Sequence, residues 1–462
     1  MFQEGVMMQA CIHVRIHSNI QDYTMFKREG IYRIDYVLVI VVTLLVAIGV
    51  LMIYSAGFDP IDKLNSGLYR KQILWFLLSF IMMIAVTFIN YQSLGDYSLQ
   101  IYVVLLLILL FTTIFGTPIR NTRAWLNLGF FSIQPSEFMK IALVMVLGKY
   151  LEIRERDIKR FRELILPSLL TIIPIMIVLY QPDFGTAVIY IPILFAMLFV
   201  GGADVSHLLS IITVASIALI GPMVLTYWEW IGAGDTNIFI DFFKNLTTLL
   251  IVAAAGMIIS GVAYAMHFFS MKKILRRIYI SGSVISLGLF ASVIIQKIFK
   301  EYQKKRILVF LNPDLDPHGS GYNIIQSKIA IGSGGFFGKG FLKGSQSQLG
   351  FLPEKSSDFI FSVVAEEWGF IGSLILIALF SIVVFRGIQI AFEAKDKFGA
   401  LLASGITSIF FFHIFINIGM VIGIMPVTGL PLCFVSYGGS NLLMSMIGVG
   451  ILINIRMRKF VY

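Results

Sequence analysis

The sequence predicts an all-α polytopic membrane protein with about twelve membrane-spanning helices. Of its 462 residues, 58% are hydrophobic and only 13% are charged, about half the charged share of a typical soluble domain. Apolar runs as long as a bilayer core requires, roughly 20 residues per helix, recur along the whole chain. Helices are expected rather than strands, because an isolated strand cannot satisfy its backbone hydrogen bonds in lipid.

Hydropathy places the expected spans at residues 36–54, 73–89, 99–115, 138–151, 164–180, 186–200, 205–228, 246–269, 279–299, 359–385, 398–420 and 441–455. Residues 1–33 lack the apolar core of a signal peptide and are expected to form a cytoplasmic tail. The membrane domain is therefore expected to cover residues 34–462. Cys11 and Cys433 stand in unrelated contexts and give neither a disulfide framework nor a zinc spacing.

The basic residues orient these spans. Lysine and arginine concentrate in cytoplasmic loops. Here they cluster at 152–163, in the segment MKKILRR at 271–277, and after the last span. With both termini in the cytoplasm, all three clusters fall inside. The net charge of +10 is therefore interpreted as membrane orientation, and nucleic acid is not expected as a partner.

One long segment departs from this rule. Residues 300–358 are expected outside, yet they contain eight lysines and arginines. Long loops cross a membrane regardless of charge; alternatively, these cations face an anionic ligand. The glycine-rich and apolar composition fits either an amphipathic loop that re-enters the membrane or a ligand site, and it matches no P-loop spacing. The candidate binding residues in this segment are Gln326, Lys328, Lys339, Gln348 and Lys355.

Asp358 stands where this loop enters the next apolar run. A carboxylate at the hydrocarbon boundary is costly and usually functional. Desolvation there would raise its pKa, which suits a general base. The alternative is a helix cap, because aspartate is a favoured N-cap residue.

Further polar residues stand at helix ends on the same expected side. Glu137 and Lys140 are three residues apart, so they share a helix face and are expected either to bind a ligand or to form a structural ion pair. Asp183 follows Pro182 and either contacts a ligand or caps the next helix.

Three more candidates complete this set. Arg123 and Trp125 stand in an external loop, where tryptophan is ordinarily an interface anchor. Ser436 begins the sequence SYGGS before the last span, which is either part of a site or a flexible helix start. An amphiphile with a charged external head would require polar groups gathered at helix ends on one side of the membrane.

The strings around these residues resemble the SEDS family (shape, elongation, division and sporulation). They are RAWLNLG at 123–129, QPSEFMKIA at 134–142, QPDFGTA at 181–187, NPDLDPHGSGYNIIQSKIAIGSGGFFGKG at 312–340, SQLGFLPEKSSDFIFSVVAEEWGF at 347–370 and GIMPVTGLPLCFVSYGGS at 423–440. The resemblance runs from about residue 35 to the end, in the family's order. GIMPVTGLPL and VVAEEWG favour the branch that serves cell elongation over the branch that serves division.

The resemblance implies a glycosyltransferase that polymerises peptidoglycan strands from lipid II and releases undecaprenyl pyrophosphate. It implies that Asp358 is the catalytic residue, and that Arg123, Lys140 and the loop lysines stabilise the leaving group. It further implies a divalent cation (Mg²⁺ or Mn²⁺), although the sequence has no dedicated ligand cluster. The implied partners are lipid II, undecaprenyl-linked glycan, membrane lipid, a class B penicillin-binding protein and other membrane proteins of the elongation machinery. The implied location is the bacterial cytoplasmic membrane, with the site facing outward.

Two features depart from the family. Ser356 and Ser357 stand where the family commonly has His-Thr before its aspartate. The family typically has ten spans, so two helices are expected as an insertion within about 205–277, and the run at 279–299 is expected to replace the family's seventh span.

Two other functions fit a polytopic architecture: a flippase for lipid-linked precursors and a non-catalytic scaffold of the elongation machinery. A flippase should carry polar groups through the middle of its spans. Here His413 is the main exception to apolar span centres, which favours the polymerase.

Overall fold

The computed structural model describes residues 34–59, 64–119, 122–127, 129, 131–231, 242–243, 245–298, 309–310, 312–313, 316 and 320–459. The expected tail at 1–33 lies outside these residues. Most of the external segment before residue 320 also lies outside them, including its basic run at 300–306.

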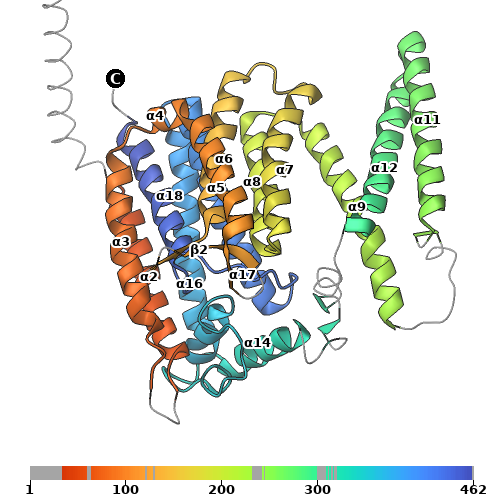
Figure 1. Ribbon diagram of the computed structural model, residues 1–462. Helices are drawn as coiled ribbons and strands as arrows, with labels where there is room; N and C mark the ends of the chain where they lie inside the picture. The colour runs from red at the N-terminus through yellow and green to blue at the C-terminus, as the bar shows by residue number, and fades with distance from the viewer. Residues whose placement is uncertain are drawn as a thin grey trace, which may run out of the picture.

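The protein is built almost entirely of helices (Figure 1). They are α2 (Tyr36–Ala56), α3 (Leu68–Phe88), α4 (Tyr91–Asp96), α5 (Ser98–Phe115), α6 (Pro135–Ile153), the 3-10 helix η2 (Phe161–Leu164), α7 (Ile165–Tyr180), α8 (Phe184–Gly201), α9 (Val205–Ile231), α11 (Leu246–Ser270), α12 (Lys273–Ile298), α14 (Ser320–Gly334), α15 (Ser345–Gln348), α16 (Ile360–Glu393), α17 (Lys397–Ile422) and α18 (Gly439–Met457). Among the described residues, eleven helices are long and apolar enough to cross a membrane. The expected fold class, an all-α polytopic membrane protein, is confirmed.

The remaining expected span, residues 138–151, lies within α6. This helix is 19 residues long but carries Glu137, Lys140, Lys149 and Glu152. Lys140 and Glu137 are buried, so their charges face protein rather than lipid.

The last helix is the centre of the main bundle. In α18, 83% of the most apolar 18-residue window is buried, compared with 22% in α5. It packs against α3, α6, α16 and α17, and α17 in turn packs against α6, α8, α14 and α16. Segments from both halves of the chain therefore form one core around α17 and α18.

The two ends of the described chain meet at one end of this bundle. Asp35 is buried, and its Oδ2 lies 2.6 Å from Arg456 Nη1 while its Oδ1 lies 3.4 Å from Arg386 Nη2. The same carboxylate accepts the N–H of Leu38 and caps α2. This shared contact ties α2, α16 and α18 together, and we call this end of the bundle the basic end.

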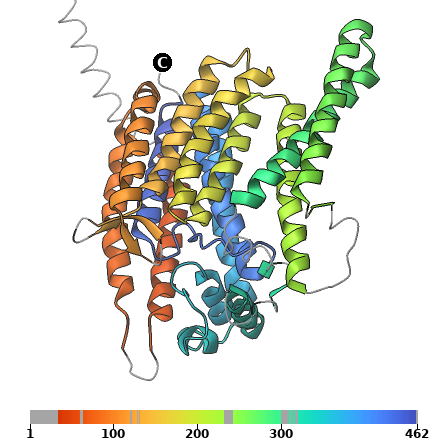
Figure 2. The ribbon, with the colours of Figure 1, turned by 45° about the vertical axis from the view of Figure 1, so that its right-hand side comes forward.

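Helices α9, α11 and α12 form a separate unit beside the bundle (Figures 1 and 2). Helix α11 packs on α12 and α12 on α9. Helix α9 meets the bundle through α8 and through the ring contact of His207 with Phe161. The unit has its own small core of Phe243, Leu249, Ala253, Leu289 and Val293. Helix α12 begins at Lys273, six residues before the apolar run at 279, because the basic residues there continue the helix beyond the hydrophobic stretch.

The opposite end, which we call the site end, holds α14, α15 and the start of α16 (Figure 1). The connection between α5 and α6, expected as a loop, forms a small antiparallel sheet of β1 (Thr117–Ile119), β2 (Thr122–Asn127) and β3 (Ser132–Ile133), in that order. Its strands are too short for hydropathy to mark, and β2 packs against α5 and α6.

Candidate active site

Asp358 lies immediately before α16, half-buried at the site end. Phe359 occupies the N-cap position of α16, and its side chain makes no capping hydrogen bond. Asp358 therefore stands one residue before the N-cap position. Its Oδ2 faces Gly429, where an added Cβ would lie 3.4 Å away. Gly429 has φ +74°, a left-handed conformation that favours glycine.

The backbone of Asp358 is held from α17. Asn417 is buried, and its Nδ2 donates to the carbonyl of Asp358 at 2.9 Å and to that of Leu430 at 2.6 Å. One amide thus joins α17, the start of α16 and the segment 423–438 that links α17 to α18. Leucine at position 417 would leave both buried carbonyls without this donor.

Ser436 provides a second clamp on the same turn. Its Oγ donates to the carbonyl of Ser357 at 2.5 Å and accepts the N–H of Leu432 at 2.8 Å. Next to it, the N–H of Tyr437 donates to the carbonyl of Ser356 at 2.9 Å. Ser436 is buried, so its position fits support of the Asp358 turn better than direct contact with an external ligand.

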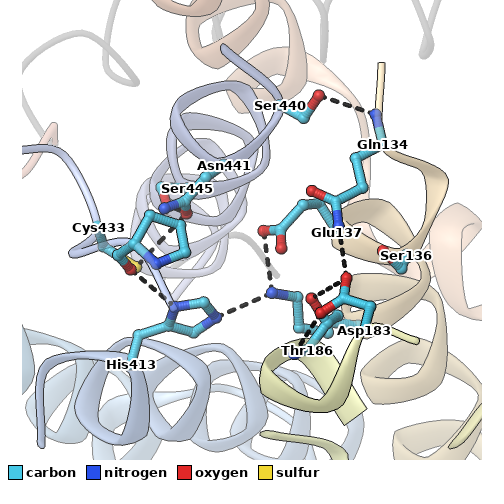
Figure 3. Close-up of polar contacts among 12 residues, drawn as sticks. Gln134, Ser136, Glu137, Asp183, Thr186, His413, Cys433, Ser440, Asn441 and Ser445 are labelled. Atoms are coloured by element: carbon cyan, nitrogen blue, oxygen red, sulfur yellow. Dashed lines mark hydrogen bonds and ion pairs between the residues drawn. The ribbon is translucent and has the colours of Figure 1, made fainter. Parts of the chain in front are cut away.

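Glu137 and Lys140 form a buried ion pair near the start of α6 (Figure 3). Lys140 Nζ lies 2.9 Å from Glu137 Oε2 and 2.8 Å from His413 Nε2, and the Lys140 side chain is 0% exposed. His413 Nδ1 faces the carbonyl of Pro431 at 3.3 Å. The structure therefore favours the structural ion pair among the alternatives for these two residues, and Lys140 links α6 to α17.

Asp183 ties the start of α8 to the start of α6 (Figure 3). Its Oδ1 accepts the N–H of Thr186 at 3.1 Å, as a helix cap does. Its Oδ2 accepts from Thr186 Oγ1 at 2.8 Å and from Gln134 Nε2 at 2.7 Å. The backbone N–H of Gln134 reaches Ser440 Oγ on α18 at 2.9 Å, so three helix starts converge here.

The external loop is fastened to α16 by a break in that helix. Gly369 has non-helical dihedral angles (φ 66°, ψ −158°), which interrupts the helical hydrogen bonds. The carbonyls of Glu366 and Glu367 instead accept the N–H groups of Lys339 and Gly340, each at 2.9 Å. The break thus supplies acceptors that hold the loop.

The Glu366 side chain strengthens this attachment. It is fully buried and its Oε1 lies 2.9 Å from Lys339 Nζ. It also accepts the N–H of Gln346 at 2.9 Å and that of Ser347 at 3.0 Å. Lys339, a candidate for ligand binding, is thus engaged in an ion pair with Glu366 on α16.

Lys355 is the loop lysine next to the Asp358 turn. Its Nζ donates to the carbonyl of Ser347 at 2.5 Å. Burial lowers the pKa of its ammonium, and the nearby Asp59 carboxylate partly opposes that shift. Gln348 lies in the same region, where its Nε2 is buried and its side chain lies near the Glu367 carboxylate.

The remaining candidates lie on α14 and on β2. Lys328 on α14 is exposed, and its side chain lies against Gly423, where an added Cβ would lie 2.7 Å from Nζ. Gln326 is half-buried on the same helix, and on β2 Arg123 is exposed while Trp125 is half-buried. Lys328 and Asp358 therefore contact the two ends of the short segment 423–429.

Sequence reasoning missed Asn417 and Glu366 as parts of this site. Asn417 was hidden inside an apolar span, and its only signal was a polar amide where lipid-facing residues predominate. Glu366 and Glu367 stand eight and nine residues after Asp358, in a helix expected to cross the membrane. Two carboxylates in such a span indicate burial against partners.

Comparison with known proteins identifies the family. A profile of the FtsW, RodA and SpoVE family, described as "Cell cycle protein", matches residues 35–246 and 237–460. The chain belongs to this family. The resemblance noted from the sequence strings is confirmed.

Curated relatives match over nearly their full lengths. The peptidoglycan glycosyltransferase RodA of Treponema pallidum is 36% identical over 433 residues, which cover 93% of this chain and 99% of the relative. Stage V sporulation protein E of Bacillus subtilis is 34% identical, with 91% and 96% covered. The peptidoglycan glycosyltransferase MrdB of Escherichia coli K12 is 32% identical, with 92% and 94% covered.

Solved structures share the fold. One, described as "Structural coordination of polymerization and crosslinking by a peptidoglycan synthase complex", is 26% identical, has a TM-score of 0.65, and is matched over 93% of this chain and 99% of that one. The rod shape determining protein RodA of Thermus thermophilus is 25% identical with a TM-score of 0.58, over 93% of this chain and 98% of that one.

The buried ion pair gives a testable prediction. Lys140→Met should lower the free energy of unfolding by about 3–5 kcal/mol, because it leaves Glu137 buried without its cation. The measurement is thermal unfolding of the purified protein in detergent. The double variant Glu137→Gln with Lys140→Met should recover most of that loss. A double variant no more stable than Lys140→Met alone would contradict the pairing.

Proposed function

We propose that this protein is a peptidoglycan glycosyltransferase that polymerises glycan strands from lipid II for cell elongation. The observation that carries the proposal is Asp358, a half-buried residue at one end of a helical membrane bundle. Asn417 donates to its backbone carbonyl and Ser436 donates to the carbonyl of Ser357, so both hold the turn that carries the carboxylate. Family membership and the names of the relatives support the reaction class.

In this proposal Asp358 is the general base. Its carboxylate takes the proton of the acceptor sugar hydroxyl on lipid II. The hydroxyl oxygen then forms a bond to the anomeric carbon of the undecaprenyl-linked glycan. The bond between that carbon and the pyrophosphate oxygen breaks, and undecaprenyl pyrophosphate leaves. A turn fixed by two hydrogen-bonded clamps keeps the base within reach of the hydroxyl, which such a transfer requires.

The leaving pyrophosphate requires cations. Arg123 and Lys328 are exposed, so their charges are accessible to it. Lys140 is fully enclosed and paired with Glu137, and Lys339 is paired with Glu366. We therefore assign Arg123 and Lys328 to the leaving group and the two paired lysines to support of the fold. Lys355, half-buried beside Asp358, is the next candidate.

Within the described residues, no group of three or more His, Cys, Asp or Glu side chains could hold a metal ion. Magnesium is commonly held by one or two carboxylates together with substrate phosphates. We therefore propose that Mg²⁺ or Mn²⁺ enters with the pyrophosphate rather than occupying a resident site.

The proposed partners follow from the same function. They are a class B penicillin-binding protein that crosslinks the new strand and other membrane proteins of the elongation machinery. The first of these is supported by the likeness to a chain from a peptidoglycan synthase complex that coordinates polymerization with crosslinking. We place the protein in the bacterial cytoplasmic membrane, with the site end outside and the basic end in the cytoplasm.

One prediction of this proposal concerns Asp358. Asp358→Ala, purified with its cognate transpeptidase and given lipid II and Mg²⁺, should polymerise at least about a hundredfold more slowly than the parent because the general base is lost. The measurement is the yield of glycan strands on a gel. Arg156→Gln, which changes an exposed charge in the connection between α6 and α7, should polymerise like the parent.

Three outcomes would count against this proposal. Polymerisation by Asp358→Ala at the parental rate would refute the assignment of the base. If neither protein polymerises but the parent moves lipid II across proteoliposomes, the flippase alternative replaces the enzyme. Polymerisation by neither protein with no transport would favour the scaffold.

Another prediction of this proposal concerns the divalent cation. EDTA should stop polymerisation, and added Mg²⁺ or Mn²⁺ should restore it. The melting temperature of the substrate-free protein should stay unchanged by EDTA, because no resident site is lost. A drop in melting temperature upon chelation would reveal a protein-held metal and contradict the proposal.

A further inference from the structure

An open groove of about 570 Å³ lies between the first turns of α9 and α12, far from Asp358 in the chain and on the opposite side of the expected membrane. Hydroxyl groups line it on both helices: Ser206, Ser210 and Thr213 on α9 and Ser281 on α12. Arg277 on α12 supplies a cation. The volume lies within the range of small-molecule sites.

Helices α9 and α12 run in the same direction. Beyond the groove, glycines on each helix let the two come close together. An added Cβ on Gly288 would lie 2.8 Å from Ile217, and one on Gly221 would lie 2.3 Å from Ser292. The same offset in sequence places Ser206 level with Arg277. The groove is thus the first part of a defined helix interface, and both helix N-termini, which favour anions, lie on its side.

The charge of the rim is strongly positive. Arg277 belongs to the exposed segment MKKILRR, with Lys272, Lys273 and Arg276. Arg277 forms no ion pair within the part of the chain that the structure describes. In a second basic groove, by contrast, Arg154 Nε lies 3.7 Å from Glu163. The carboxylate nearest in sequence to the residues that line the groove is that of Asp204, whose Oδ1 accepts the N–H of Ser206 at 2.8 Å.

The hydroxyl groups of the groove can donate hydrogen bonds to a bound anion with little loss of free energy elsewhere. Ser210, Thr213 and Ser281 donate to backbone carbonyls one turn earlier in their own helices, at 2.8 to 2.9 Å. Because helical carbonyls also accept an N–H, these hydroxyls can turn to a phosphate without leaving a buried acceptor unpaired.

The remaining lining is apolar and fits a chain rather than a soluble ion. Leu209, Ile280 and Val284 continue the groove away from Arg277. At the adjoining end of α11, Phe268 is 74% exposed and Phe269 is 85% exposed. Exposed aromatic residues next to basic residues are typical of the lipid headgroup region.

We propose that the groove between α9 and α12 binds the headgroup of an anionic phospholipid of the cytoplasmic leaflet. The phosphate lies on the Arg277 guanidinium, whose planar fork matches phosphate oxygens, and the serine hydroxyls donate to it. The acyl chain follows the apolar lining. This site gives the three-helix unit a function independent of the glycosyl transfer.

The test compares two lipids on the full-length protein in detergent. Native mass spectrometry would measure binding of dioleoylphosphatidylglycerol and dioleoylphosphatidylcholine. The parent should bind the anionic lipid about tenfold more tightly. Arg277→Gln should lose about tenfold in that affinity, whereas Arg276→Gln, which removes the same charge outside the groove lining, should lose less than about twofold. Ser281→Leu should weaken binding by filling the groove with Arg277 intact.

Three results would overturn the proposal. Equal losses in Arg277→Gln and Arg276→Gln would indicate diffuse attraction to a basic surface. Equal affinity of the parent for the two lipids would remove the headgroup preference. Undecaprenyl phosphate that displaces the anionic phospholipid and binds more than tenfold more tightly, with the same dependence on Arg277, would assign the groove to a polyprenyl lipid instead.

Discussion

The structure depends on one constraint: polar groups taken into a membrane protein must find partners inside it. At the site end, other side chains and backbone groups supply these partners. Asn417 donates to two carbonyls, Lys140 contacts Glu137 and His413, and Asp183 accepts from Gln134 and Thr186. The contacts of Asn417, of Lys140 with His413 and of Asp183 with Gln134 join different segments of the chain, so satisfying these polar groups also assembles the site.

The same constraint separates supporting residues from those free to meet substrate. Lys140 and Lys339 carry charge, but each is committed to a buried carboxylate, and breaking such a pair is costly. Arg123 and Lys328 remain exposed. The network therefore fixes the turn that carries Asp358 and leaves Arg123 and Lys328 exposed. This arrangement suits a reaction that must admit and release a charged lipid.

Hydropathy predicted most of the fold, because long apolar runs have few alternatives in a bilayer. It missed the sheet at 117–133, whose strands are too short for a hydropathy signal, and the early start of α12, where basic residues prolong the helix. The strings around Asp358, Glu137 and Asp183 marked polar residues near helix starts, where the structure also places them. Which of them face ligand could not be read from sequence, because the partners of Lys140 and Lys339 depend on tertiary packing: His413 lies 273 positions from Lys140.

Asn417 on α17 donates to the backbone carbonyl of Asp358, and we propose that this contact positions the aspartate for catalysis. Steady-state kinetics of lipid II polymerisation by Asn417→Leu, a similar-sized side chain without the donor, tests this role. The expected result is a fall in kcat of about ten- to a hundredfold, with lipid II affinity unchanged within about twofold. A folded variant with the parental kcat, or one that loses only lipid II affinity, would contradict it.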